Sequence, residues 1–141
     1  MKYIIVYWSR YGNNKKIVDY LAERLQGDVQ VFKTEEANPA AMPEADYYIF
    51  SAAAEAFNIQ KNMRKFMKEL KGMDKKKYGI INTHAMKNKN WLHKMEKLLS
   101  KKKMVKIAGV DFQIGDGSQT GDGLMEGWEE KLNEFASKIL E

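Results

Sequence analysis

The stretch that decides the fold reads KYIIVYW at Lys2–Trp8, SRYGNN at Ser9–Asn14 and KKIVDYLAERLQ at Lys15–Gln26. The first segment is a short apolar run rich in β-branched and aromatic residues, which predicts a buried strand. The last segment has apolar residues at helical spacing and is followed by Gly27, which predicts a helix over Asn13–Gln26. A strand, a tight polar loop and a helix in this order begin a parallel α/β sheet.

The loop between this strand and this helix has the character of an anion site. It places backbone N–H groups and the hydroxyl of Ser9 at the positive end of a helix, where phosphates bind readily. Ligands of open parallel sheets also bind outside the carboxyl ends of the strands, where this loop lies. The alternative is an ordinary strand–helix turn with a capping residue, and the loop residues alone leave both readings open.

Strand-like and helix-like segments alternate along the rest of the chain, which predicts one domain over residues 1–141. Right-handed crossovers, an amphipathic edge strand and an apolar central strand predict an open parallel five-stranded sheet, order 2-1-3-4-5, with helices on both faces. The further strands are expected at Val29–Lys33, Tyr47–Ser51, Tyr78–Asn82 and Met104–Val110 (extended to Ile114), and the further helices at Gln60–Lys71, Asn90–Leu99 and Leu124–Leu140.

Composition excludes several kinds of site. The chain has no cysteine and two histidines, so disulfides, thiolate nucleophiles, iron–sulfur clusters and zinc sites are not expected, and no metal site is predicted. Any redox chemistry would therefore need a bound organic cofactor. The sequence holds no apolar run of about 18 residues, so no membrane span is expected and a cytoplasmic location is the default.

The net charge is +5 and the excess is largely lysine, concentrated in residues 75–77, 87–97 and 101–103. These lysines are read as solvated turns and helix faces, with an anionic partner as the alternative. No nucleic-acid-binding motif accompanies them, so a nucleic-acid partner is not expected.

The segment Ile5–Val18, IVYWSRYGNNKKIV, resembles the phosphate loop of the flavodoxin-like family. In that family the strand ends in Ser or Thr, the fourth loop position is Gly and the sixth carries a hydroxyl. Ser9 and Gly12 match this pattern, whereas Tyr11 and Asn14 replace the usual hydroxyl residues. The layout of the whole chain is similar as well. It lacks the loop that long-chain flavodoxins insert into strand 5, so the resemblance is to short-chain flavodoxins.

The resemblance implies non-covalent FMN binding and electron transfer. The side chains of Ser9, Asn13 and Asn14 would then hold the phosphate, together with the N–H groups from Arg10 to Asn14. Gly12 would let the ligand approach the backbone, because a Cβ would obstruct it. The phosphate-loop residues implied in this way are Ser9, Arg10, Tyr11, Gly12, Asn13 and Asn14.

The flavin ring would lie between the loops Ser51–Asn58 and Asn82–Asn88. In the first, small residues would let the backbone reach the ring and Phe57 would stack on it; the alternatives are a helix N-terminal turn and a phenylalanine packed under its own loop. In the second, His84 is a candidate flavin contact or proton donor, weighed against an exposed loop histidine. Trp91 is placed in the core rather than on the ring. The ring-binding residues implied are Ser51, Ala52, Ala53, Ala54, Phe57, Asn82, Thr83 and His84.

The sequence thus favours an FMN-binding electron carrier that meets a redox partner protein. Because this chain is basic, a partner with an acidic surface would suit it. Two alternatives stay open: an FMN-dependent oxidoreductase of the quinone-reductase or porphyrinogen-oxidase type, and a flavin-free flavodoxin-like interaction domain. The carrier is preferred to an enzyme with its own substrate because no insertion is evident that would form a substrate pocket.

Overall fold

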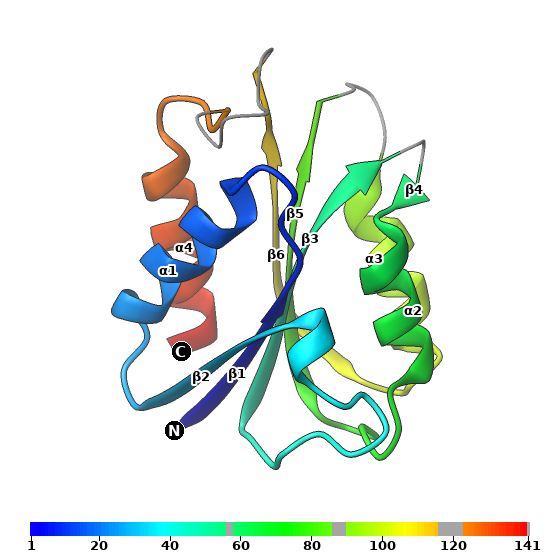
Figure 1. The fold of residues 1–141 in the computed structure, drawn as a ribbon. Helices are drawn as coiled ribbons and strands as arrows, with labels where there is room; N and C mark the ends of the chain where they lie inside the picture. Colours follow the sequence, from blue (N-terminus) through cyan, green and yellow to red (C-terminus); the bar gives the residue numbers. More distant parts are fainter. Residues whose placement is uncertain (56–57, 86–89, 116–122, 141) are drawn as a thin grey trace.

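A parallel β-sheet forms the centre of the molecule and helices pack on both of its faces (Figure 1). The computed structural model describes residues 1–55, 58–85, 90–115 and 123–140. The elements in chain order are β1 Lys2–Tyr7, α1 Asn13–Arg24, β2 Asp28–Lys33, the 3-10 turn η1 Thr34–Glu36, β3 Tyr47–Glu55, β4 Asn58–Ile59, α2 Lys61–Glu69, β5 Lys77–His84, α3 Trp91–Ser100, β6 Val105–Gln113 and α4 Trp128–Leu140.

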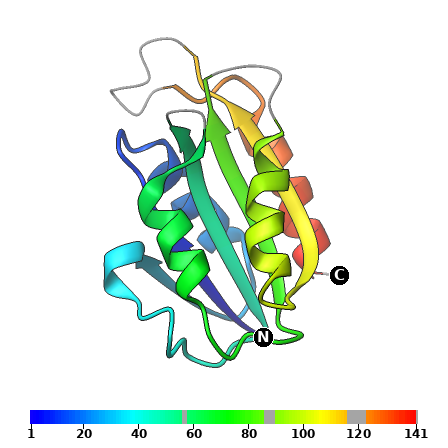
Figure 2. The ribbon, with the colours of Figure 1, turned by 90° about the vertical axis from the view of Figure 1, so that its right-hand side faces the viewer.

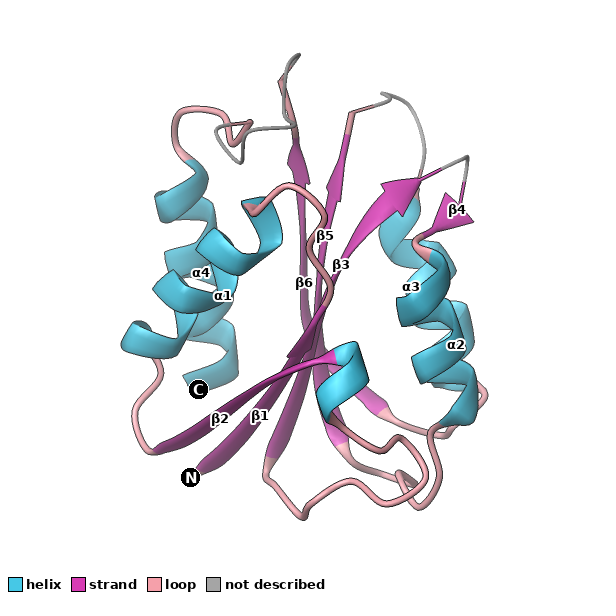
Figure 3. Cartoon of the chain, in the orientation of Figure 1, coloured by secondary structure: helices cyan, strands magenta, loops and turns pink. Residues whose placement is uncertain are grey.

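The strand order is β2-β1-β3-β5-β6, and each neighbouring pair on this path is parallel (Figure 3). Counted along the chain, these five strands have the order 2-1-3-4-5, so the predicted sheet is confirmed. The short β4 is an addition that the sequence did not indicate. It pairs antiparallel with the end of β3, where Ala54 faces Ile59 and Glu55 faces Asn58.

Two buried layers hold the helices against the sheet. One core cluster, which includes Val6, Phe50 and Trp91, lies under α2 and α3. The other, which includes Ile5, Ile17 and Phe135, lies under α1 and α4. Inner strands are apolar on both faces because helices cover both faces. Within the described ranges, no helix is both long and apolar enough to span a bilayer.

Gly79 marks a close approach between β5 and α4. A Cβ built on this residue would lie 2.7 Å from Cζ of Phe135 and 3.1 Å from Cδ1 of Ile139. The hydrogen-bond register between β5 and β6 also shifts between Tyr78 and Gly79. A side chain at this position would therefore push α4 away from the sheet.

The chain around Ser51–Asn58 differs from the prediction. The strand predicted to end at Ser51 continues as β3 through residues 52–55, which were expected in a loop, and the helix N-terminal turn considered for the alanines is wrong. Alanine has weak β-propensity, which hid the strand in the sequence. The ladder to β5 overrides this preference, because Ala52 pairs with Asn82 and Ala53 pairs with Thr83.

The end of β5 and the start of α4 also differ from the prediction. β5 continues past the predicted end at Asn82 to His84, so Thr83 and His84 lie in a strand rather than in the expected loop. The last helix begins at Trp128 rather than at Leu124, because Gly127 has a φ of 89°, which no helix residue adopts. Leu124 instead forms an antiparallel bridge with Ile114. Trp91 is buried in the core, as predicted.

Candidate functional site

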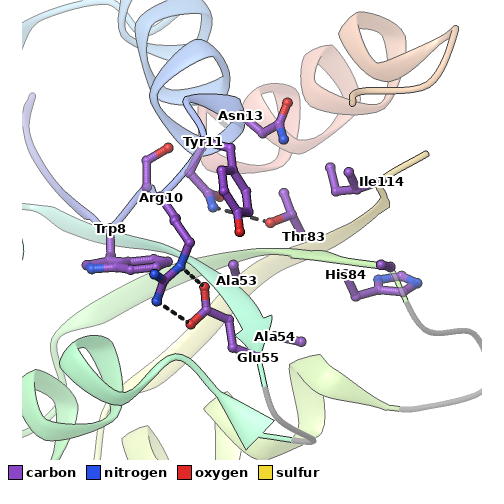
Figure 4. Close-up of a pocket in the computed structure, with 13 residues that line it drawn as sticks. Trp8, Arg10, Tyr11, Asn13, Ala53, Ala54, Glu55, Thr83, His84 and Ile114 are labelled. Carbon is purple, nitrogen blue, oxygen red and sulfur yellow. Dashed lines mark hydrogen bonds and ion pairs between the residues drawn. The ribbon is translucent and has the colours of Figure 1, made fainter. Parts of the chain in front are cut away.

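A cavity of about 460 Å³ opens at the carboxyl end of the sheet (Figure 4). Its walls come from four places that are far apart in the sequence: the β1–α1 loop, the end of β3, the end of β5 and the residue after β6. This volume lies within the range of about 300–1,000 Å³ typical of small-molecule sites. The lining residues are Trp8, Ser9, Arg10, Tyr11, Asn13, Asn14, Ala53, Ala54, Glu55, Thr83, His84, Ala85 and Ile114.

The β1–α1 loop presents the start of α1 to this cavity. Gly12 adopts a left-handed conformation with φ 96° and ψ −4°, which turns the chain into the helix. The hydroxyl oxygen of Ser9 accepts hydrogen bonds from the backbone N–H of Gly12 at 3.1 Å and of Lys15 at 3.4 Å. The first turn of α1 carries no acidic residue, so no carboxylate there offsets the positive end of the helix. The loop is therefore electrostatically suited to an anion.

A buried polar network braces the wall behind the loop. The hydroxyl of Ser51 donates to Oδ1 of Asn14 at 2.9 Å, and Nδ2 of Asn14 donates to Oγ1 of Thr83 at 3.2 Å. All three residues are at most 3% exposed. The Asn14 side chain thus joins the first turn of α1 to β3 and β5, a bracing role that the sequence did not indicate.

Asn13 makes a second long-range connection. Its side-chain oxygen accepts a hydrogen bond from the backbone N–H of Gly123 at 3.1 Å. Gly115 N–H donates to the carbonyl of Gly123 at 2.9 Å, and Ile114 bridges to Leu124. These contacts hold the two ends of the Gly115–Gly123 segment beside the first turn of α1.

An ion pair crosses one side of the cavity. Arg10 donates from Nε and Nη2 to the two carboxylate oxygens of Glu55, at 2.8 and 3.0 Å (Figure 4). The guanidinium also lies 5.1 Å from the ring centroid of Trp8. The hydrogen bond to Glu55 raises the pKa of Arg10, and an arginine guanidinium is in any case always charged in proteins. The pair connects the β1–α1 loop to the end of β3.

His84 is held from behind by a carboxylate. Its Nδ1 lies 3.0 Å from Oδ1 of Asp111, and the same oxygen accepts a hydrogen bond from Nδ2 of Asn82 at 3.1 Å. A carboxylate at Nδ1 selects the tautomer that carries its proton there and fixes the ring orientation. Since His84 lines the cavity, its Nε2 is the ring nitrogen left for a ligand.

The predicted site residues fall into three groups in the structure. Nine of them line the cavity: Ser9, Arg10, Tyr11, Asn13, Asn14, Ala53, Ala54, Thr83 and His84. Gly12, Ser51, Ala52 and Asn82 do not line it, although Gly12 shapes the loop and Ser51 bonds to Asn14, which lines it. Asn82 bonds to Asp111, the carboxylate that holds His84. Phe57 lies outside the described residues.

Sequence reasoning missed four residues of the cavity wall: Trp8, Glu55, Ala85 and Ile114. Each lies at or just beyond the end of a parallel strand. Two of the four, Trp8 and Ile114, follow the ends of β1 and β6. Correct strand ends combined with the strand order would have placed them at this edge.

Comparison with known proteins identifies the family. A family model described as flavodoxin domain matches residues 4–118. This chain belongs to the flavodoxin family. Membership confirms the predicted family, and with it FMN as the cofactor and electron transfer as the function of the family. A search of curated proteins gives no match.

Solved structures share the fold at low sequence identity. The Streptococcus pneumoniae flavodoxin is 19% identical with a TM-score of 0.78, and the match covers 99% of this chain and 98% of that one. A short-chain flavodoxin associated with a bacterial microcompartment is 17% identical with a TM-score of 0.78, over 99% and 97% of the two chains. The rubredoxin:oxygen oxidoreductase of Desulfovibrio gigas is 16% identical with a TM-score of 0.80, over 98% of this chain but 35% of that one.

Proposed function

We propose that this flavodoxin carries electrons on an FMN held in the cavity at the carboxyl end of its sheet. The observation that carries the proposal is the position of the cavity, which joins the start of α1 to the ends of β3 and β5. FMN supplies a flavin ring that takes up and releases electrons. The protein binds and orients this ring and limits its contact with water.

The residues present fit this cofactor. Ser9 and the backbone N–H groups of the β1–α1 loop would hold the phosphate, because the first turn of α1 presents donors and no acidic side chain. At the other end of the cavity the wall consists of small side chains, which leave room for a planar ring; they are those of Ala53, Ala54 and Ala85. Trp8 and Tyr11 add aromatic surface, which packs well against such a ring.

The test is a titration of the purified protein with FMN and with riboflavin, followed by flavin fluorescence. FMN should bind at least about tenfold more tightly than riboflavin, or about 1.4 kcal/mol, if the loop holds the phosphate. Ser9→Ala should narrow this difference, whereas Ser100→Ala, at an exposed position of α3, should preserve it. Equal affinity for both flavins would contradict the phosphate assignment.

A second pair of variants tests the ring position. Ala54→Leu fills part of the cavity and should weaken both flavins by about tenfold or more, since an overpacked site excludes the ring. Ala40→Leu adds the same side chain at an exposed loop position and should leave both affinities unchanged. If neither flavin binds the wild-type protein, the cofactor proposal fails and the flavin-free interaction domain takes its place.

The proposal extends to the redox partner. A protein of net charge +5 is attracted to a partner with an acidic surface, which raises the rate of encounter. The cytoplasmic location expected from the sequence stays a prediction.

One observation favours an oxidoreductase as the second candidate function. A quinone takes up two protons with two electrons, and His84, held at Nδ1 by Asp111 at 3.0 Å, would as an imidazolium donate one of them from Nε2 in the cavity wall. In the FMN-loaded protein, His84→Gln should then lower quinone turnover about a hundredfold but leave reduction of a one-electron, proton-free acceptor unchanged. His93→Gln, exposed on α3, is the matched control. If His84→Gln lowers turnover equally with both acceptors, His84 does not transfer a proton to the quinone.

A further inference from the structure

Charge is divided very unevenly along this chain. Residues 61–106 contain 16 of the 24 Lys and Arg residues but only 3 of the 19 Asp and Glu residues. This third of the sequence therefore has a formal charge of +13, and the remainder has a charge of −8. The net charge of +5 conceals a strongly dipolar molecule.

The fold gathers part of this positive charge on one side. The helices α2 and α3 lie side by side over the same face of the sheet, as Figure 2 shows. Their outward positions and the turns that follow them carry exposed lysines. We call this surface the basic face and define it by Lys61, Lys65, Lys68, Lys71, Lys97 and Lys101.

The exposed Glu69 of α2 lies among the lysines of the basic face, so their charge is compensated only in part. Within the described part of the protein, no ion pair joins any of the six lysines to a carboxylate. The nearby Glu96 pairs instead with Lys106 and His93. Six exposed ammonium groups on one surface create a positive potential that attracts an anionic surface over several ångströms.

The basic face reaches the end of the molecule where the cavity opens at Lys61, whereas Lys68, Lys71, Lys97 and Lys101 lie at the opposite ends of α2 and α3. α2 begins at Lys61, directly after β4, which pairs with the end of β3. α3 follows the end of β5, where Thr83, His84 and Ala85 line the cavity. A partner that covers the two helices from end to end would therefore also border the cavity.

We propose that the basic face is the docking surface for the redox partner, and that the partner presents an acidic protein surface to it. This inference rests on the proposed electron-transfer function. Nucleic acids and membranes are anionic too, but neither exchanges electrons with a flavin. The negative remainder of the molecule repels an acidic partner and so restricts its approach to this side.

The test uses the isotopically labelled protein and a purified acidic ferredoxin as the probe. Titration followed by NMR should shift amide signals of residues 61–71 and 94–106, in the FMN-free and the FMN-loaded protein alike. Binding should weaken about tenfold between about 0.02 and 0.3 M salt, because the attraction is screened. Shifts confined to α1 and α4 would overturn the proposal.

Two charge-reversal pairs separate the surface from the net charge. Lys65→Glu with Lys97→Glu should weaken ferredoxin binding about tenfold. Arg24→Glu with Lys138→Glu changes the net charge equally on α1 and α4 and should weaken it less than about threefold. Circular dichroism checks that both variants are folded. Equal weakening by both pairs would overturn the proposal.

Other anions and the cofactor are tested in parallel. If a short DNA duplex or phosphatidylserine vesicles bind more tightly than the ferredoxin, the basic face binds that anion and not an acidic protein, and the proposal is wrong. If FMN does not bind but the ferredoxin docks on the basic face, the proposed function is wrong and the basic face is still a docking surface for acidic proteins. If FMN binds and the ferredoxin docks elsewhere, the surface fails and the function remains.

Discussion

The side chain of Asn14 stabilises the cavity wall by connecting α1 to β3 and β5. Its amide accepts from Ser51 and donates to Thr83, and all three residues are almost fully buried. Asn14→Ala would leave a buried hydroxyl on each of two strands without this partner. We expect the free energy of unfolding in urea to fall by about 1–3 kcal/mol.

The matched control is Asn62→Ala, which makes the same substitution at an exposed position of α2. Surface substitutions of this kind change stability by about 0.5 kcal/mol or less. An Asn14→Ala protein as stable as this control would show that the network adds nothing to the fold.

Tyr78 gives a pH dependence with a definite sign. Burial, assisted by the carboxylate of Glu96, raises the pKa of Tyr78 to about 12. In the unfolded chain a tyrosine loses its proton near pH 10, so between about pH 10 and 12 the folded state binds more protons than the unfolded state. The free energy of unfolding should therefore fall as pH rises through this window.

Tyr78→Phe removes this titration and should make the alkaline loss of stability smaller than in the wild type. Urea unfolding at several pH values between about 8 and 11.5 measures the difference. Tyr11→Phe, at an exposed position, should follow the wild-type curve. Parallel curves for all three proteins would contradict the role of Tyr78.

At this scale the sequence indicated the loop but not its contacts. Ser9 and Gly12 form part of a local motif, so their neighbourhood could be predicted from spacing. The Arg10–Glu55 pair joins residues 45 positions apart, and nothing local in the sequence marks either as the partner of the other. Pairing of this kind depends on where β3 ends, which is Glu55 rather than the predicted Ser51.

The elements themselves were predictable wherever periodicity was strong. All four helices and the five parallel strands were expected, and their order follows from right-handed crossovers. The run Ser51–Glu55 was not recognised as strand because alanine prefers helices, whereas pairing with β5 determines its structure. β4 consists of two residues, which is too short for any periodic signal.

Gly79 allows a prediction about how elements pack. Gly79→Ala places a Cβ 2.7 Å from Phe135, so β5 and α4 must separate or Phe135 must leave its rotamer. We expect a loss of about 1–3 kcal/mol in the free energy of unfolding, measured in urea. In Gly115→Ala the new atom lies no closer than 3.8 Å to its nearest neighbour, and this control should lose far less.

The whole molecule explains why the position of the site was easier to predict than its wall. In a doubly wound sheet, the strand order alone sets where the crevice lies, between β1 and β3 at their carboxyl ends. The cavity lies at this end. Its exact wall depends on how far each strand continues past the sheet, which is a property of pairing rather than of any one segment.

Cofactor binding should also be visible in the stability of the whole fold. A ligand that binds only the folded state stabilises it by about 2.7 kcal/mol at a free concentration of a hundred times its dissociation constant. Urea unfolding with FMN at that level should show this gain. Riboflavin at the same concentration should give less, and an equal gain would argue against a phosphate contact.

The hydrogen bond from Gly123 to Asn13 spans 110 positions of the chain and has a consequence for biosynthesis. While the ribosome is still translating residues before Gly123, Asn13 in the first turn of α1 lacks this hydrogen-bond donor. Asn13 cannot form this bond until residues up to about 123 have left the exit tunnel, since domains fold as units once enough chain is available. Tight loading with FMN should therefore follow the synthesis of residue 123 rather than accompany the synthesis of β1 and α1.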